Sequence, residues 1–510
     1  MHTNAGTLLK NTLLLSVSSI AIRFIGLLFQ IYLAKNVGAE GLGIFGLISS
    51  AYTIFVTVSI SGMRFSLTRL VAEEEGLGNP YPKRLVSTGL FYALSFGLIS
   101  FFLLFNLSSF IAQKWICTDY ARLPLKILSF SLPFISISAV FDGYFSAKQK
   151  ILRLVILQLL DQLLRIGTTV FCFSKVRGAI NHPCDVLSLS SLCGEVFCAL
   201  AVLWLYTLEA RKKTDKAPHN KNIPRLLKTA MPLAISAYMR TGLSSLGHII
   251  IPYGLRRSGM GGSGAFITYG IIHQMSFPVL LFPIAVLSAF GEILVPRITK
   301  AQVEGQKHEI SHISNRALRL ALIFSFAICG FMFFFGYYLG EAFYKSAEAG
   351  LYIRLLAPLI PVIYCDCVTD GCLKGLGQQL HSMILNVLEA LLNVLLLLFL
   401  LPRIAIVGYI LTVYIKESFN TFFSLRRLSR VTKLDSQFFT IIALLSAAAG
   451  SFVITTFVFK EPVLQAVFYF VFYSALIYII NDSSRNDIKW LISLVRGSTA
   501  RRTANDCDCL

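Results

Sequence analysis

Residues 437–459 read QFFTIIALLSAAAGSFVITTFVF and contain no charged side chain. A helix of about 20 apolar residues is long enough to span the ~30 Å hydrocarbon core of a bilayer. Similar stretches fill most of the 510-residue chain, which is 55% hydrophobic and only 14% charged. Because backbone groups in lipid must find their hydrogen bonds within the segment, we predict an all-α polytopic membrane protein with about 14 transmembrane helices. The predicted spans are 8–34, 42–63, 85–113, 124–147, 152–173, 186–208, 226–254, 264–292, 313–338, 352–376, 380–401, 404–423, 437–459 and 463–482.

Lysine and arginine are distributed unevenly between alternate connectors. With the N-terminus in the cytoplasm, the cytoplasmic connectors and adjoining span ends contain 29 of the 46 Lys and Arg residues, and the outer ones contain 10. This is the positive-inside pattern of membrane proteins. It accounts for the net charge of +20 without a nucleic-acid partner. We therefore predict a multi-pass protein of the cytoplasmic membrane with both termini in the cytoplasm.

The chain contains an internal repeat with an offset of 228 residues. Residues 123–133, LPLKILSFSLP, resemble residues 351–361, LYIRLLAPLIP. Several polar residues inside or beside apolar helices recur at the same offset, namely Asp142-Gly143 as Asp370-Gly371, Asp161 as Glu389 and Arg69 as Arg297. A shared offset for several such residues is hard to obtain by chance.

This repeat defines the predicted domains. The first six spans and the next six would form two six-helix lobes, and because six is even, both lobes have the same orientation. Transporters with repeats of this kind bind their substrate near the membrane midplane between the halves. The predicted limits are 1–208 for the N-terminal lobe, 209–228 for a basic cytoplasmic linker, 229–430 for the C-terminal lobe, 431–482 for two additional spans and 483–510 for a cytoplasmic tail.

Basic residues in the middle of predicted spans are the first candidates for function. An ionised side chain near the bilayer centre costs at least ~2.5 kcal/mol, so it faces a cavity or a partner rather than lipid. Arg23 and Arg240 suit a diphosphate, because a guanidinium donates two parallel hydrogen bonds to oxyanions. The alternative for both is a salt bridge between the lobes or a side chain that snorkels to one surface. His273 could add positive charge or titrate during transport, and its alternative is a buried, neutral, hydrogen-bonded histidine.

The acidic residues near the ends of two matched spans form a second group. Asp142 and Asp370 close the fourth and tenth predicted spans, and Lys148, Lys150 and Lys374 follow within a few residues. The functional interpretation is a set of gating ion pairs or an ion-coupling site. The structural alternative is capping at contacts between helices.

Two further acidic residues lie deeper in the predicted spans. Asp161 is followed four residues later by Arg165, so an ion pair within one helix is the simplest explanation for both. Glu389 has no basic residue in its own span and has Asn386 and Asn393 as neighbours. Asp161 and Glu389 are therefore candidates for gating or ion coupling.

No motif for covalent chemistry stands out. The sequence contains no Walker A motif, no dinucleotide-binding fingerprint and no HExxH motif, and the connectors are too short for a soluble catalytic domain. We expect no catalytic residue, no metal site, no cofactor and no enzymatic activity. The energy source would be a monovalent ion gradient or the membrane potential.

Several segments resemble one family of bacterial membrane proteins. The chain is similar to the stage V sporulation protein B family of the multidrug/oligosaccharidyl-lipid/polysaccharide exporter superfamily, which also contains lipid II flippases. The resemblance covers roughly residues 8–430. The segments that support it are 24–34 (FIGLLFQIYLA), 37–46 (VGAEGLGIFG), 61–64 (SGMR), 68–73 (TRLVAE), 349–358 (AGLYIRLLAP) and 371–378 (GCLKGLGQ).

The resemblance implies a two-lobed bundle with a V-shaped cavity. Related lipid II flippases bind pyrophosphate with arginines in their first, second and eighth spans. By position, Arg23 corresponds to the first of these and Arg64 lies at the end of the second span, while His273 lies near the basic position of the eighth. The last two spans are implied to add a groove for the lipid tail.

We therefore predict a flippase that moves an undecaprenyl-diphosphate sugar, with a peptidoglycan precursor as one candidate, by alternating access. Its partners would be this lipid-linked glycan, membrane lipids and a coupling ion. One alternative is an ion-coupled multidrug or cation antiporter of the same superfamily. A non-transporting scaffold in envelope assembly or sporulation and an integral-membrane transferase are the others. Which glycan, which ion and which cellular process are involved stays open at this point.

Overall fold

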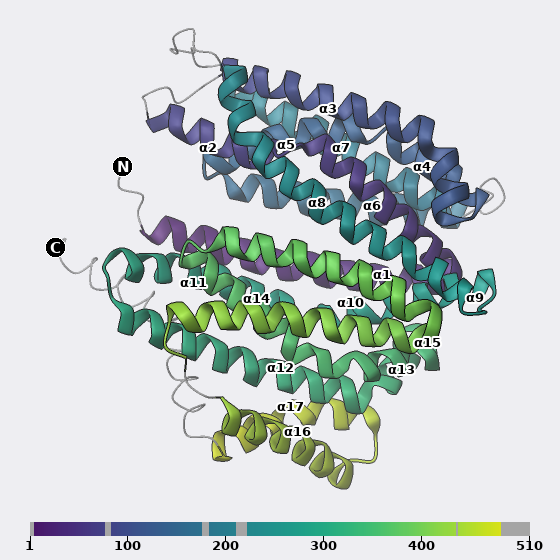
Figure 1. The fold of residues 1–510 in the computed structure, drawn as a ribbon, viewed down its shortest axis with the longest axis vertical. Helices are drawn as coiled ribbons and strands as arrows, with labels where there is room; N and C mark the ends of the chain where they lie inside the picture. Colours follow the sequence, from purple (N-terminus) through teal and green to yellow (C-terminus); the bar gives the residue numbers. More distant parts are fainter. Residues whose placement is uncertain (1–4, 77–82, 176–182, 211–221, 435–436, 481–510) are drawn as a thin grey trace. The chain divides into compact units, whose positions relative to one another are not determined.

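Helices are the only regular elements in the part of the chain that the computed structural model describes (Figure 1). Ten of the described helices are long and apolar enough to cross a membrane, or eleven if the bent pair α4–α5 counts as one span. The prediction of an all-α polytopic membrane protein is confirmed, and the number fourteen stays a prediction. The described residues are 5–76, 83–175, 183–210, 222–434 and 437–480.

Two long helices each contain two of the predicted spans, which lowers the count of separate helices. Helix α1 (Ala5–Ile60) bends at Gly38, whose φ of 76° is one that glycine adopts without steric cost. Helix α15 (Gln379–Val431) breaks at Ile404 and Ala405, just after the apolar segment 380–401. That the two halves of each helix cross the membrane separately stays a prediction.

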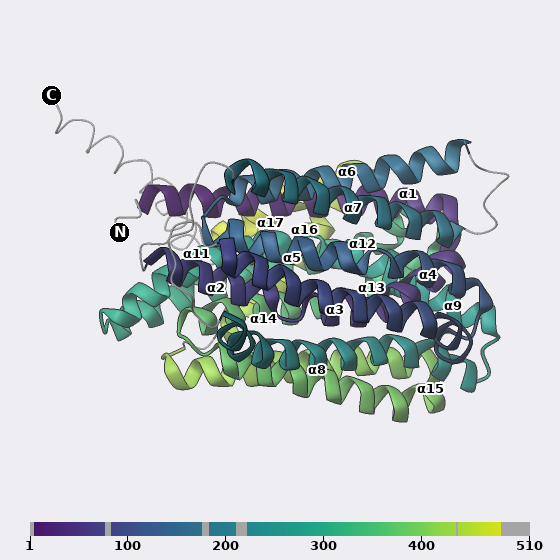
Figure 2. The same cartoon turned by 90° about the horizontal axis from the view of Figure 1, so that it is seen from above.

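The first of two compact units consists of the described parts of Met1–Met275 together with Asn386–Val413. Its core lies where α2, α3, α5 and α7 pack together, around Met63, Phe141 and Tyr144, and these helices lie side by side in Figure 2. Besides α1 and the middle of α15, its helices are α2 (Met63–Gly76), α3 (Lys83–Phe110), α4 (Arg122–Ser129), α5 (Leu132–Ala147), α6 (Ile151–Lys175), α7 (Pro183–Ala210), α8 (Asn222–Arg257), α9 (Gly262–Gly270) and most of the π-helical turn η3 (Ile271–Ser276).

The second unit consists of the described parts of Ser276–Leu385 and Tyr414–Leu510. Leu322 and Phe326 of α12 pack there against Leu444, Ala447 and Tyr473. Besides both ends of α15, its elements are α10 (Phe277–Leu281), α11 (Ile284–Val303), α12 (Lys307–Tyr344), α13 (Ala347–Leu356), the 3-10 turn η4 (Ala357–Leu359), α14 (Ile360–Gly375), α16 (Phe438–Val458) and α17 (Pro462–Ile480).

The backbone repeats at the offset that the sequence indicates. Helix α14 begins and ends 228 residues after α5, and each has a proline as its second residue, Pro133 or Pro361. Left-handed residues recur at the same offset, Cys117 (φ 59°) with Lys345 (φ 51°) and Gln149 (φ 54°) with Gly377 (φ 67°). The breaks before and after these helices are therefore duplicated features of the chain.

The structure contains one helix that the sequence analysis did not predict. Part of the predicted linker and the predicted tail lie outside the residues that it describes. Residues 63–76 form helix α2, where only a connector was expected, because the search for apolar stretches overlooks a polar helix. The lobe limits stay predictions. The predicted tail, 483–510, lies outside the described residues, as do residues 211–221 of the predicted linker.

Candidate functional site

Arg23 lies exposed on the first half of α1. Gln30, seven residues later and on nearly the same helix face, donates hydrogen bonds to the backbone and side-chain oxygens of Gln274 at 2.8 and 3.2 Å. Arg23 therefore lies on the face of α1 that contacts η3, two turns away from that contact. It forms no ion pair with any carboxylate of the described residues.

Arg240 is also exposed and likewise pairs with no described carboxylate. Its helix, α8, contacts α15 at two glycines: a Cβ at Gly247 would lie 2.6 Å from the Asn393 amide nitrogen, and one at Gly254 would lie 2.3 Å from Leu401. Seven residues separate Arg240 from Gly247, and the same seven separate Gly247 from Gly254. Arg240 thus occupies the next position along the helix face that meets α15.

Glu389 lies one turn before Asn393 on α15 and is half-buried. Because Asn393 lies opposite Gly247 and both helices advance in the same direction, Glu389 is at a level between Arg240 and Gly247. The structure therefore brings Arg240 and Glu389 to neighbouring levels of one unit, although they lie far apart in sequence.

His273 lies in a cluster of aromatic side chains within the first unit. Its Nε2 and the hydroxyl of Tyr409 are 2.9 Å apart, and its ring centroid lies 4.9 Å from that of His248 and 4.6 Å from that of Tyr269. The Tyr269 hydroxyl lies 3.2 Å from Nδ1 of His248. His273 is therefore hydrogen-bonded and half-buried, and its protonation state and role stay predictions. The partners of His273 come from three other helices, so no local spacing in the sequence indicates them.

Arg64 and Asp142 lie next to each other at the contact between α2 and α5. Arg64, exposed in the first turn of α2, is the cation that interacts electrostatically with the half-buried Asp142. The helices approach closely here, because a Cβ at Gly143 would lie 2.7 Å from the Arg64 carbonyl oxygen. The two lysines that follow Asp142 pair elsewhere, Lys148 with Glu75 at 3.4 Å and Lys150 with Glu209 at 2.5 Å.

Asp161 belongs to an ionic triad that links α6 to α7. The Arg165 Nε lies 3.0 Å from both Asp161 carboxylate oxygens, so the ion pair predicted from their spacing is confirmed. The same guanidinium donates to Glu195 of α7 through Nη2 at 2.6 Å. Gly194 leaves the space for this contact, because a Cβ there would lie 2.4 Å from Asp161. The sequence analysis missed Glu195, since no local spacing connects it to Arg165.

Asp370 is the one candidate that lies in the second unit. Lys374 of the same helix approaches its carboxylate to 2.6 Å, which is an i,i+4 pair on α14. The other seven candidates lie in the first unit. The structure does not test the roles that the sequence suggested for any of the eight.

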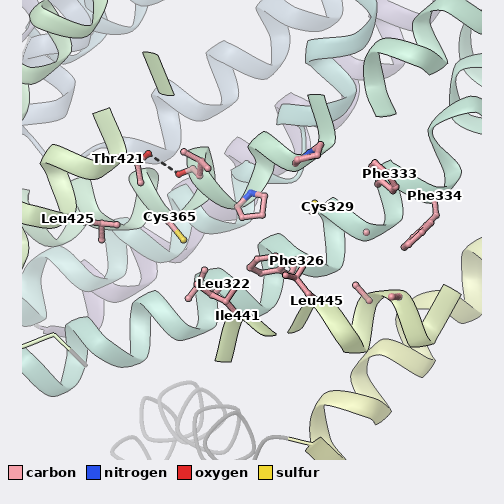
Figure 3. Close-up of a pocket in the computed structure, with 16 residues that line it drawn as sticks. Leu322, Phe326, Cys329, Phe333, Phe334, Cys365, Thr421, Leu425, Ile441 and Leu445 are labelled. Atoms are coloured by element: carbon pink, nitrogen blue, oxygen red, sulfur yellow. Dashed lines mark hydrogen bonds between the residues drawn. The ribbon is translucent and has the colours of Figure 1, made fainter. Parts of the chain in front are cut away.

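An apolar cavity of about 640 Å³ lies within the second unit (Figure 3). Its walls come from α12, the turn η4, the first half of α14, the end of α15, and α16. The hydroxyl of Thr421 donates to the Val362 carbonyl at 3.2 Å, so this polar atom is satisfied by the wall itself. The lining residues that Figure 3 labels are Leu322, Phe326, Cys329, Phe333, Phe334, Cys365, Thr421, Leu425, Ile441 and Leu445. The cavity therefore offers hydrocarbon surface and suits an apolar chain.

Two family models match the chain, one over residues 8–302, described as polysaccharide biosynthesis protein, and one over residues 268–399, described as MatE. Stage V sporulation protein B of Bacillus subtilis (strain 168) is 23% identical over 398 residues, which cover 76% of this chain and 76% of the relative. The lipid II flippase MurJ of the same organism is 20% identical over 414 residues, or 74% of each protein.

Solved structures share the fold at low sequence identity. The inward closed conformation of a lipid II flippase MurJ aligns with a TM-score of 0.72 at 15% identity and covers 92% of this chain and 98% of that one. An inward-facing multidrug resistance MATE family transporter aligns with a TM-score of 0.63 at 14% identity, covering 82% of this chain and 100% of that one. The resemblance inferred from the sequence motifs is confirmed.

Proposed function

Because the chain belongs to the polysaccharide biosynthesis protein family, we propose that it flips a polyprenyl-diphosphate oligosaccharide across the cytoplasmic membrane. The observation that supports this most directly is the pair Arg23 and Arg240, exposed in apolar helices of one unit and unpaired with described carboxylates. Two permanently charged groups at membrane depth are tolerated where they line a polar cavity. An anionic diphosphate is the ligand that such groups bind best.

The apolar cavity of the second unit, considered by itself, suits the lipid part of such a substrate. A polyprenyl chain needs a hydrocarbon surface, and the cavity walls present phenylalanine, leucine and isoleucine side chains. A polyprenyl chain would bind against this hydrocarbon surface. No covalent step is needed, because transport requires only that the diphosphate exchange between cytoplasmic and outer access.

Arg64 and His273 would extend the cationic surface around the diphosphate. Arg64 is exposed at the start of α2, but the negative charge of Asp142 beside it offsets its positive charge. His273 contributes positive charge only when it is protonated. We therefore assign the principal phosphate contacts to Arg23 and Arg240.

A second candidate function, cation antiport, has one supporting observation. Two carboxylates, Asp161 and Glu195, share the single guanidinium of Arg165 in the first unit. A carboxylate in excess of its cation is what a site for Na⁺ or H⁺ requires. The MatE model matches residues 268–399, in agreement with this alternative.

The test reconstitutes the full chain in proteoliposomes with a fluorescent polyprenyl-diphosphate oligosaccharide and measures how fast the outer leaflet exposes or loses the label. We expect Arg23→Ala and Arg240→Ala each to slow flipping by about tenfold or more, because each removes charge-assisted hydrogen bonds to the diphosphate. Arg69→Ala is the matched control, since Arg69 is exposed on α2 and pairs with Glu73 of the same helix. Flipping at the parental rate in both variants would overturn the arginine assignment. Efflux of cationic dyes without lipid flipping would favour the antiporter.

A further inference from the structure

Two histidines of the first unit lie against each other. The ring centroids of His248 and His273 are 4.9 Å apart with an interplanar angle of 77°. Both side chains are half-buried, one on α8 and the other on the π-helical turn η3. Imidazole is the side chain that ordinarily gains or loses a proton near neutral pH. A pair of imidazoles within the predicted membrane spans can therefore bind a proton as well as pack. Short π-helical turns occur frequently at functional sites.

Each imidazole has a tyrosine hydroxyl as a hydrogen-bond partner. Tyr409 lies 2.9 Å from Nε2 of His273, and Tyr269 lies 3.2 Å from Nδ1 of His248. A tyrosine hydroxyl both donates and accepts, so it can donate to a neutral imidazole or accept from a protonated one. The same hydrogen bond therefore holds either protonation state after rotation of one O–H bond. A purely structural histidine would need a partner for one state only.

Two titratable groups in contact with the pair are Tyr269 from α9 and Tyr409 from α15, and both are almost fully buried. The nearest charged groups along α8 are Arg240 and Arg256, each eight residues from His248. On α1, Gln30 faces the neighbouring Gln274, and on α15 Asn393 faces α8 at Gly247. Glu389, one turn before Asn393 on α15, adds a carboxylate near the level of His248, so its charge and those of the arginines of α8 act on the pair.

Two imidazolium ions at this separation repel each other strongly where the dielectric constant is low. Protonation of one ring therefore disfavours protonation of the other, and the two rings titrate as a coupled pair rather than as separate groups. One added positive charge appears in the unit that contains Arg23 and Arg240. An anion bound to those arginines would favour this proton, and by linkage the proton would favour the anion.

We propose that His248 and His273 form a binding site for a single proton, and that this proton is the coupling ion of transport. The coupling part rests on the proposed function, whereas the proton site stands on the geometry of the pair. Proton uptake would accompany capture of the diphosphate, and proton release would accompany its departure. His248 lies on α8, His273 on η3 and Tyr409 on α15. A change in the charge of the two histidines would therefore strengthen or weaken the contacts among these three elements.

The proton site is tested by nitrogen NMR of histidine-labelled full-length protein in lipid bilayers, with signals assigned by His248→Gln and His273→Gln. Glutamine keeps an amide that can bond to the tyrosine hydroxyl, and size-exclusion profiles confirm folding of each variant. We expect the pair to bind one proton between about pH 5 and pH 8, and the remaining ring of each variant to bind its proton at higher pH than in the pair. His308 and His312, exposed on α12, serve as an internal control. Two rings that stay neutral throughout, or that titrate without influence on each other, would refute the site.

The coupling is tested in the proteoliposome assay with the membrane potential clamped and a pH gradient imposed. The parent should change its flipping rate by about fivefold or more with the gradient, and His273→Gln should lose this dependence. A parent rate that ignores the gradient, together with a titrating pair, would refute coupling and leave the proton site standing. If no polyprenyl diphosphate is flipped under any condition, the proposed function fails, and the NMR titration alone decides on the proton site.

Discussion

The Asp-Gly segment of α5 and its repeat in α14 have the same backbone and different ionic partners. Asp142 faces Arg64 of another helix, α2, whereas Asp370 pairs with Lys374 of its own helix at 2.6 Å, and Lys374 also interacts with Glu292 of α11. The position that repeats Arg64 is Glu292, which reverses the charge. Duplication has therefore conserved the helix break and allowed the ionic contacts to diverge.

This difference separates contacts that depend on helix movement from contacts that do not. An ion pair between two helices changes when the helices separate, whereas an i,i+4 pair within one helix is kept through any rigid-body motion. The triad of Arg165, Asp161 and Glu195 adds another contact between helices in the first unit. We expect ionic substitutions in the first unit to have larger effects than those at Asp370 and Lys374.

The largest effect should follow removal of the guanidinium that two carboxylates share. Arg165→Ala leaves Asp161 and Glu195 without their cation, and breaking such a partly buried network costs about 3 kcal/mol. Thermal unfolding of the purified protein in detergent measures this loss as a lower midpoint. Arg165→Lys, which retains the charge but not the planar fork, should lose distinctly less. An unchanged midpoint in Arg165→Ala would mean that the triad contributes nothing to stability.

The matched glycines provide the next comparison. A Cβ at Gly143 would lie 2.7 Å from the Arg64 carbonyl oxygen, whereas one at Gly371 would lie 3.3 Å from the Cα of Gly291. Gly143→Ala should therefore destabilise the protein by about 1–3 kcal/mol through overpacking, and Gly371→Ala by less. The same unfolding measurement applies to both variants. Equal losses would show that the α2–α5 contact is no tighter than its repeat.

A third substitution tests the second unit where its surface is apolar. Ala449 lines the cavity and is exposed, so Ala449→Phe would occupy space that a polyprenyl chain needs. Flipping of a long-chain substrate should fall by about tenfold while that of a short-chain analogue changes little. Ile442→Phe adds volume to a residue of the same helix outside the cavity and is the control. Equal slowing of both substrates would argue against chain binding in this cavity.

The smallest effect is expected at Lys374, whose side chain is half-exposed. Exposed i,i+4 pairs stabilise helices by about 0.3–0.5 kcal/mol, so Lys374→Gln should leave unfolding almost unchanged. Arg64→Gln should alter the flipping rate more than Lys374→Gln does, because the 2.6 Å ion pair of Lys374 lies within its own helix, whereas Arg64 interacts with Asp142 of another helix. A larger transport defect in Lys374→Gln would reverse the interpretation of the two segments.

The sequence predicts the helices of this protein well because hydrophobic length is a local property. The apolar runs define nearly all the spans, and Pro133 and Pro361 mark the duplicated breaks. Spacing within one helix also predicts the Asp161–Arg165 pair. These features need no knowledge of which helices are neighbours.

Contacts between helices are what the sequence leaves undetermined. Glu195 lies 30 residues from Arg165 and Tyr409 lies 136 residues from His273, and no spacing rule links either pair. Helix α2 is missed because it is polar, and the cavity of the second unit requires four elements to be placed together. The roles of the charged residues stay predictions, since only a transport measurement with a substrate can test them.

The left-handed turns at Gln149 and Gly377 occupy the same position in the two repeats, as expected if the chain arose by duplication. Glycine adopts this conformation freely, whereas glutamine adopts it at a steric cost, so the same bend has a residue that suits it in one repeat and a strained residue in the other. An even number of predicted spans in each copy means that a tandem gene fusion required no inversion in the membrane. A half-length ancestor would then have worked as a parallel homodimer before its two subunits were joined into one polypeptide.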